Sequence, residues 1–267
     1  MNSVARNVIY KLFIKLNNKR TKKLKLHFFD YLDTVFYVLK NGVAWNAICD
    51  KRVHYTTFFK FYKNLVKLDI FNIAYKILGA YYCKQNINNF KNIFIDATMI
   101  KNINGHDNLG PNHYDRCRKG NKITVLVDNT GIPISIHITK SNIHELKAVD
   151  SIINGSVIKL VKCRIIADKG YNDSKTKLKL RRKHNISLIY PYKKNQKDAD
   201  RQRKLNTTFE RNLLKKRYIV EHFFSWLKKY KRIRQRYDKQ CVNYLNFVYF
   251  GVINMIANRL YPHAKGK

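Results

Sequence analysis

Acidic side chains are scarce in this sequence. Its 267 residues include 17 Asp and Glu against 54 Lys and Arg, which gives a formal net charge of +37. Hydrophobic residues still make up 45% of the chain and aromatic residues 13%, so the charge does not imply disorder. A folded chain this basic repels itself, and a polyanion relieves that repulsion while releasing counterions. Nucleic acid is the expected partner, with an anionic membrane surface or an acidic protein as the alternative.

Long apolar runs and paired cysteines are also missing. No stretch has the roughly 20 apolar residues that a membrane-spanning helix needs. Residues 244–260 come nearest, but three asparagines interrupt them, so we expect a core helix there. Two lysines among the apolar residues of 8–16 argue against a secretory signal and favour a surface helix. The five cysteines lie far apart without a C-x-x-C pair, which indicates neither zinc nor disulfides. We expect an intracellular protein, in the cytoplasm or nucleoid of a bacterium or in the nucleus of a eukaryote, and no membrane partner.

The first third of the chain carries apolar residues at helical spacing. Residues 24–82 show no alternating strand pattern, so this part is predicted to be all-helical. Thr56 and Thr57 are expected to cap a helix that ends at Lys67 and carries lysines at i, i+3 and i+7. These lysines are Lys60, Lys63 and Lys67. Such a stripe suits a helix-turn-helix region that binds DNA, and a solvated lysine face explains it equally well. We predict a DNA-binding region over 1–88.

After a polar linker at 84–91 the pattern changes to strands alternating with helices. Strands are predicted at 92–100, 122–128, 132–139, 163–167 and 186–190, and helices at 144–153, 174–183 and from about 213 onward. Asp128 and the following Asn129-Thr130-Gly131 favour a tight turn, so the second and third strands should form a hairpin. This order predicts an α/β, ribonuclease-H-like mixed sheet flanked by helices, over 89–262. Residues 193–208 are expected to form a loop, with an arm that grips a DNA strand as the alternative, and residues 263–267 a basic tail.

Three of the scarce acids occupy positions that suit a metal site. Asp96 follows the apolar run 93–95 and Asp168 follows 165–167, so both are predicted at strand ends, while Glu221 lies in a helical pattern. Two-metal phosphoryl transfer needs carboxylates from different elements around ions about 3.5–4 Å apart. A lone Asp after an apolar run is more often a turn cap, and pairing with Arg217 four residues earlier also explains Glu221. Together the three positions favour a site for two Mg²⁺ or Mn²⁺ ions.

The helix pattern around Glu221 places two cations beside it. At about 100° per residue, Arg217, Glu221 and Lys228 fall at roughly 0°, 40° and 20° on one helix that runs through all three. The apolar residues between them, such as Phe223 and Leu227, lie on the opposite side and should be buried. Arg217 and Lys228 are therefore placed to contact phosphates on either side of a cleavage point.

These blocks resemble the catalytic motifs of insertion-sequence DDE transposases, in the compact branch with a Tyr-x2-Arg-x3-Glu-x6-Lys signature. The matching segments are Phe94-Ile95-Asp96-Ala97-Thr98, Ala167-Asp168-Lys169-Gly170-Tyr171, Arg217-x3-Glu221-x6-Lys228, Arg118-Lys119-Gly120-x-Lys122, Asn142-x-His144-Glu145 and Arg236-Tyr237-Asp238. The similarity covers about 92–240. Leu214 stands where the signature has Tyr, so no role is carried over for that residue.

The resemblance implies specific roles. Asp96, Asp168 and Glu221 would be the catalytic metal ligands, Arg217 and Lys228 would contact transposon-end DNA, and His144 would lie near the active site. For Glu145 we expect no more than a favourable interaction with the dipole of the helix that it opens. The other candidate DNA contacts are Lys119, Lys122, Lys169 and Arg232.

The segment 201–239 adds a basic strip with aromatic residues. It holds 14 Lys and Arg against three acids, with Trp226, Tyr230 and Tyr237 interleaved. Such a strip suits a phosphate backbone and unpaired bases that stack on aromatic rings, and a solvated charged face is the alternative.

The sequence thus predicts a DNA transposase of the cut-and-paste type. It would bind the element's ends and target double-stranded DNA, as a homodimer or larger assembly, and catalyse metal-dependent strand cleavage and strand transfer. The alternatives are a metal nuclease of the same fold without strand transfer, and a non-catalytic basic DNA-binding protein.

Overall fold

The computed structural model describes residues 1–17, 24–113, 115–191 and 206–262. The chain forms two compact units, which are taken separately. The helical unit comprises Met1–Tyr82, Lys101–Asn108 and Trp226–Lys267, and the sheet unit comprises Cys83–Ile100 and Leu109–Ser225. The predicted tail 263–267 and most of the predicted loop 193–208 lie outside the described residues. The predicted division at 88/89 and 262/263 concerns functional domains and stays a prediction.

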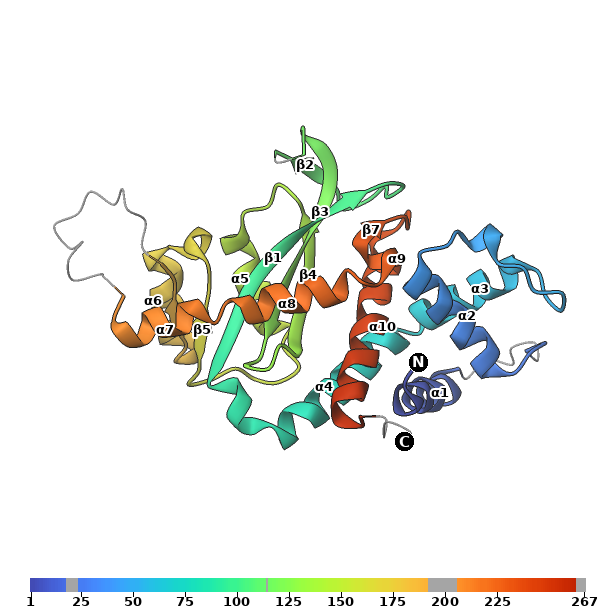
Figure 1. Cartoon of the computed structure of the whole chain (residues 1–267), viewed down its shortest axis with the longest axis horizontal. Coiled ribbons are helices and arrows are strands. Elements are labelled where there is room, and N and C mark those ends of the chain that lie inside the picture. Colours follow the sequence, from blue (N-terminus) through green and yellow to red (C-terminus); the bar gives the residue numbers. More distant parts are fainter. Residues whose placement is uncertain (18–23, 114, 192–205, 263–267) are drawn as a thin grey trace. The chain divides into compact units, whose positions relative to one another are not determined.

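The helical unit confirms the helical pattern predicted for 24–82 (Figure 1). Its elements are α1 (Ser3–Leu16), α2 (Phe28–Asn41), η1 (Trp45–Ala47), α3 (Tyr55–Lys67), most of α4 (Ile70–Gln85), α9 (Lys231–Arg234), β7 (Gln235–Arg236) and α10 (Cys241–Leu260). As predicted, α10 is a core helix. Its buried Asn254 accepts a 2.8 Å hydrogen bond from the Asn2 backbone N–H and donates one of 3.2 Å to the Tyr230 hydroxyl.

The turn after α2 requires glycine. Gly42 caps this helix with a left-handed φ of 69°, and a Cβ there would lie 2.8 Å from the Cβ of Lys231. The predicted cap of α3, in contrast, is wrong. Thr56 and Thr57 lie inside the first turn, because the chain becomes helical at Tyr55, and His54 occupies the N-cap without a side-chain capping bond.

The sheet unit contains the predicted mixed sheet. Its elements are η2 (Ile87–Phe90), most of β1 (Asn92–Asn102), β2 (Gly110–Asn112), β3 (Arg118–Val127), β4 (Pro133–Lys140), α5 (Glu145–Asn154), β5 (Arg164–Ile166), η3 (Lys169–Tyr171), α6 (Ser174–His184), β6 (Ser187–Ile189), α7 (Thr208–Lys215) and most of α8 (Tyr218–Leu227). Neighbouring strands follow the order β2-β3-β1-β5-β6, and β4 pairs with β3. Strands β1, β5 and β6 run parallel, whereas β2, β3 and β4 form antiparallel pairs.

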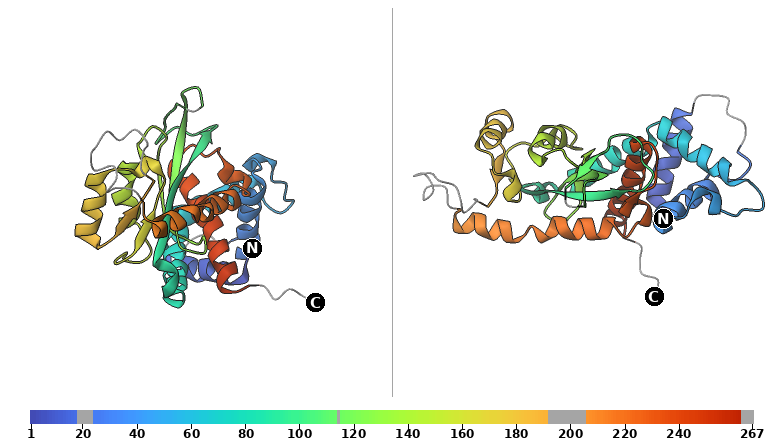
Figure 2. Two further views of the ribbon diagram at one scale, coloured as in Figure 1. Left: turned by 60° about the vertical axis from the view of Figure 1, so that its left-hand side comes forward. Right: turned by 90° about the horizontal axis from the view of Figure 1, so that it is seen from above.

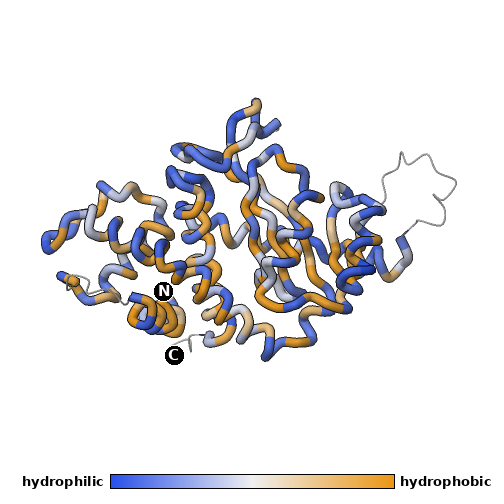
Figure 3. Tube along the Cα trace, turned by 180° about the vertical axis from the view of Figure 1, so that it is seen from behind, coloured by the Kyte–Doolittle hydropathy of each residue, from blue (hydrophilic) through white to orange (hydrophobic). Residues whose placement is uncertain are grey.

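The β3–β4 pair is the predicted hairpin. The Asp128 carboxylate accepts bonds from the backbone N–H groups of Thr130 (2.9 Å) and Ile132 (2.8 Å), which confirms its assignment to the turn. Hydrophobic residues line the strands of this unit (Figure 3). The right-hand view of Figure 2 shows α7 and α8 on one side of the sheet and α5 and α6 on the other. Ligands of open α/β sheets bind outside the carboxyl ends of the parallel strands, and Asp168 lies just beyond that end of β5.

The sequence predicted Asp96 at the end of a strand, and this prediction is wrong. The parallel register of β1 with β5 stops at Phe94 and Ile166, but β1 continues to Asn102. The strand extends because Lys101 and Asn102 pair with β7, a partner far along the chain. Asp96 nevertheless lies two residues beyond the last parallel pair, where β5 no longer covers that side of β1.

The predicted single helix through Arg217, Glu221 and Lys228 is interrupted. Helix α7 ends at Lys215, α8 spans Tyr218–Leu227, and Lys228 follows in a turn. Around Arg217 the backbone closes with i→i−3 bonds, such as Val220 N–H to the Arg217 carbonyl at 3.1 Å. Such bonds tighten helix ends, so the regular 100° spacing assumed for these residues does not hold across both turns.

Candidate active site

Asp96 is the centre of an acidic cluster in the sheet unit. Its Oδ1 accepts a 2.8 Å bond from the Ala97 N–H, and its Oδ2 lies 3.7 Å from the Arg217 guanidinium. Burial raises the pKa of Asp96; the Ala97 bond and Arg217 lower it, while Asp168 and Glu221 raise it further. The turn after β5 and helix α8 therefore bring Asp168 and Glu221 within electrostatic range of Asp96 on strand β1.

Asp168 caps the short turn η3 after β5. Its Oδ1 accepts a 2.6 Å bond from the Gly170 N–H, which fixes the carboxylate beside the strand end. A Cβ placed on Gly170 would lie 2.8 Å from this oxygen and 3.3 Å from Oε2 of Glu145. Two carboxylates thus meet at a glycine whose missing side chain leaves them room.

Glu145 also belongs to this acidic cluster, which sequence reasoning did not predict. It is the first residue of α5, and its Oε1 lies 3.8 Å from the Lys122 Nζ. Burial raises the pKa of Glu145; Lys122 and Arg217 lower it, and Asp168 and Asp96 raise it. The only signal in the sequence was its place in the Asn142-x-His144-Glu145 segment, because a first-turn acid is otherwise explained by the helix dipole.

The cluster carries excess negative charge. Asp96, Asp168, Glu221 and Glu145 contribute −4, and Arg217 and Lys122 contribute +2, which leaves a formal −2. The buried Tyr171 hydroxyl and the buried Arg217 Nε have no hydrogen-bond partner among the described residues. Burial and the charges of Glu145, Asp96 and Asp168 raise the pKa of Tyr171 well above its usual value.

This donor set fits a hard divalent cation. Carboxylate oxygens are the ligands that Mg²⁺ and Mn²⁺ prefer, and a bound cation offsets the excess charge. Within the described ranges, no group of three or more His, Cys, Asp or Glu side chains is already close enough to hold a metal ion. Asp96, Asp168 and Glu221 are the residues that would hold it, with Glu221 exposed on α8.

The other predicted site residues of the sheet unit differ in exposure. Lys119 on β3 and Lys169 in η3 are exposed. Lys122 is 8% exposed, and its Nζ donates a 2.9 Å bond to the Ile143 carbonyl. His144 is the exposed N-cap of α5, where its Nδ1 accepts a 3.3 Å bond from the Leu146 N–H. It directly precedes Glu145 in the sequence.

In the helical unit, the residues predicted to contact DNA also differ in exposure. Lys60 and Lys67 on α3 are exposed, whereas the Lys63 Nζ bonds to Gln240 and Asn243 at 2.8 and 3.1 Å. Burial lowers the pKa of Lys228, and so does the nearby positive charge of Arg234. Arg232 is buried and donates to both Asp238 oxygens, at 2.9 and 3.2 Å.

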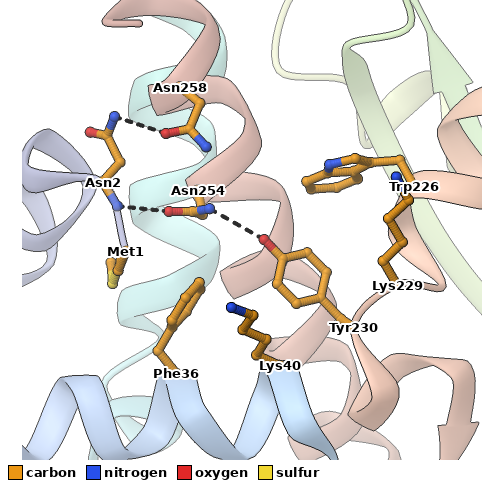
Figure 4. A pocket seen from close by; sticks show the side chains of 9 residues that line it. All are labelled: Met1, Asn2, Phe36, Lys40, Trp226, Lys229, Tyr230, Asn254 and Asn258. Atoms are coloured by element: carbon orange, nitrogen blue, oxygen red, sulfur yellow. Dashed lines mark hydrogen bonds between the residues drawn. The ribbon is translucent and has the colours of Figure 1, made fainter. Parts of the chain in front are cut away.

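A pocket in the helical unit gathers part of the basic aromatic strip (Figure 4). It has a volume of about 360 Å³ and combines three aromatic rings, two lysines and three asparagines with Met1. The lining residues are Met1, Asn2, Phe36, Lys40, Trp226, Lys229, Tyr230, Asn254 and Asn258. The Trp226 ring lies edge-on to Tyr230, with 5.3 Å between the ring centroids. None of the lining side chains is acidic, which suits a polyanionic or aromatic ligand.

Comparison with known proteins identifies the family. The profile of the transposase DDE domain matches residues 91–250, more than half of the chain. The chain belongs to this family. It is also 25% identical, over 165 residues, to a putative transposase for insertion sequence element IS402 from Burkholderia cepacia, covering 58% of this chain and 72% of the relative.

The fold has a counterpart among solved transposases. The chain is similar to the piggyBac transposase in its synaptic complex with hairpin DNA, with a TM-score of 0.51 and 8% identity, over 98% of this chain and 73% of that one. At this identity the likeness concerns the fold, and it agrees with the predicted ribonuclease-H-like sheet. In the described parts of this transposase-family chain, no helix is both long and apolar enough to cross a bilayer.

Proposed function

We propose that this protein is a cut-and-paste DNA transposase that cleaves DNA at the ends of its mobile element and joins the freed 3′-OH to target DNA. The observation that carries the proposal is that Asp96, whose Oδ2 lies 3.7 Å from the Arg217 guanidinium, is within electrostatic range of both Asp168 and Glu221 in the sheet unit. Membership of the transposase DDE family supports DNA strand transfer as the reaction in which these three acids take part.

The chain's own residues divide the work. Asp96, Asp168 and Glu221 would hold Mg²⁺ or Mn²⁺, two ions in all, which when bound activate the attacking oxygen and stabilise charge on the phosphate. Strand β1 and the Gly170 N–H fix two of these carboxylates before DNA arrives. Arg217 offsets the charge of Asp96 and presents a guanidinium that suits a phosphate oxygen.

Binding to double-stranded DNA follows from the charge and the helices. The net charge of +37 favours any phosphate backbone, and the exposed Lys60 and Lys67 of α3 support residues 1–88 as the region that reads the element ends. Both element ends must be brought together before joining, so we propose a homodimer or larger assembly on DNA. An end-bound complex whose total protein mass equals one subunit under strand-transfer conditions would contradict this assembly.

The test separates three activities. Asp96→Asn should abolish cleavage of a labelled element end while DNA binding persists, because it removes a metal ligand and changes the net charge by only one unit. A pre-cut end offered together with a supercoiled target distinguishes transposase from nuclease, since only a transposase gives joined products. Unchanged cleavage by the Asp96→Asn variant would instead favour a DNA-binding protein with a contaminating nuclease.

A further inference from the structure

Glu145 approaches Asp168 from an element outside the predicted triad. Its Oε2 and the Asp168 Oδ1 both converge on the α-carbon of Gly170, at 3.3 and 2.8 Å from the position a Cβ would take. Any other residue at position 170 would push at least one carboxylate aside. The glycine therefore keeps α5 and η3 close enough for the two acids to act on the same ligand.

Lys122 holds the other oxygen of Glu145. The Lys122 Nζ lies 3.8 Å from Oε1 and is itself anchored by a 2.9 Å bond to the Ile143 carbonyl. The lysine is 8% exposed and Glu145 is 26% exposed, so the lysine side of this contact is shielded from solvent. Glu145 thus has one oxygen beside a buried cation and the other beside Gly170, on the side where the Asp168 Oδ1 also lies.

A buried hydroxyl without a hydrogen-bond partner among the described residues lies beside these acids. Tyr171 directly follows Gly170, is fully buried, and its O–H has no hydrogen-bond partner among the described residues. Its electrostatic partners include Glu145, Asp96 and Asp168. Buried polar groups are normally satisfied by protein or ordered water, so this hydroxyl indicates that water belongs among these acids.

We propose that Glu145 is a fourth carboxylate of the metal site: together with Asp168 it binds the divalent cation, directly or through the cation's water, and Lys122 holds it in position. This inference rests on the proposed function, because the cation is the one assigned to Asp96, Asp168 and Glu221. The alternative is that Glu145 serves only as the structural partner of Lys122.

Binding of Mn²⁺ to the full-length protein without DNA tests the proposal, with free Mn²⁺ measured by electron paramagnetic resonance. Glu145→Gln should weaken Mn²⁺ binding about tenfold or more, the range found when groups around a metal are removed. Asp150→Asn is the matched control: it lies on the same helix but is half-exposed and paired with Lys179. Its Mn²⁺ affinity should match that of the wild type.

A second pair of variants guards against misfolding, because Glu145→Gln leaves Lys122 buried without its counter-charge. Lys122→Met keeps the Glu145 carboxylate, and the double variant with Glu145→Gln removes both charges. The double variant should bind Mn²⁺ about tenfold more weakly than Lys122→Met alone. Equal affinities in this pair would overturn the role of Glu145.

The Asp96→Asn variant keeps the two proposals apart. If it loses cleavage and Mn²⁺ binding while the Glu145 variants bind Mn²⁺ normally, only the fourth carboxylate is refuted. If Asp96→Asn still cleaves, the proposed function fails whatever Glu145 does.

Discussion

Removal of the Asp96 carboxylate should stabilise the metal-free protein and abolish its stabilisation by divalent cations. The Asp96 side chain is 19% exposed and lies in a cluster with a formal charge of −2, so its ionised form is costly without a cation. Asp96→Asn reduces that charge to −1 and keeps the side chain's shape. The melting temperature of the metal-free variant should therefore equal or exceed that of the wild type.

In the presence of a divalent cation, the wild type should have a higher melting temperature than the Asp96→Asn variant. A cation present at 100 times its Kd stabilises the folded state by about 2.7 kcal/mol. For a domain of 150–250 residues, 1 kcal/mol shifts the melting temperature by about 2–4 °C, so Mg²⁺ or Mn²⁺ should raise that of the wild type by about 5–10 °C. The Asp96→Asn variant should gain little of this increase.

Thermal unfolding monitored by circular dichroism, with EDTA or with excess Mn²⁺, measures both effects. Asp150→Asn controls for the loss of an acid elsewhere in the same unit and should respond to Mn²⁺ as the wild type does. An Asp96→Asn protein that Mn²⁺ stabilises as strongly as the wild type would refute the assignment of Asp96 as a ligand.

Four further outcomes are expected. First, burial raises the folded-state pKa of Asp96, so the folded metal-free protein holds a proton on this carboxyl more tightly than the unfolded chain does. The free energy of unfolding should therefore fall as pH rises through the raised pKa, and denaturant titrations of Asp96→Asn should show a smaller fall. Second, Asp238→Ala should cost about 3–5 kcal/mol in urea unfolding, because it leaves the buried Arg232, 6% exposed, without its counter-charge; a cost below 1 kcal/mol would contradict a buried pair. Third, Lys60→Ala with Lys67→Ala should reduce the salt dependence of DNA binding by about two ions, at about 0.9 per phosphate contact, and an unchanged slope would remove α3 from the DNA interface. Fourth, in a Trp45→Phe background Trp226 is the sole tryptophan, and its fluorescence should be quenched more by single-stranded than by duplex oligonucleotide; equal quenching would argue against stacking on unpaired bases.

The sheet was predictable because its signals are local. Short apolar runs, the Asn129-Thr130-Gly131 turn and the helical patterns after it specify the strand and helix order without long-range information. The spacing of the acids relative to those runs then brought Asp96 to β1 and Asp168 to the turn after β5, the parallel neighbour of β1. The short strands β2 and β7 were not predicted, because three-residue and two-residue strands carry too few residues for an alternating pattern.

Charge alone did not reveal which cations face solvent. Lys122 and Arg232 were predicted to contact DNA. Both are buried instead, Lys122 beside Glu145 and Arg232 beside Asp238. Because cations far outnumber acids in this chain, the sequence does not show which cation pairs with a given buried carboxylate. Tertiary packing determines the pair. The exposed Lys60, Lys67, Lys119 and Lys169 are therefore better supported as DNA contacts than the predicted set as a whole.

The extension of β1 and the position of Glu145 have a common cause. Both depend on contacts between segments far apart in sequence: β1 with β7, and α5 with the turn after β5. A sequence pattern places an acid at the end of a strand or the start of a helix, but it does not show that two such ends meet. Where they meet over a glycine, as Asp168 and Glu145 do at Gly170, the glycine itself becomes a sign of the site. Replacing it with alanine should weaken Mn²⁺ binding because the new Cβ would lie 2.8 Å from Asp168 Oδ1, and retained affinity would show that the two carboxylates need not approach each other to bind the ion.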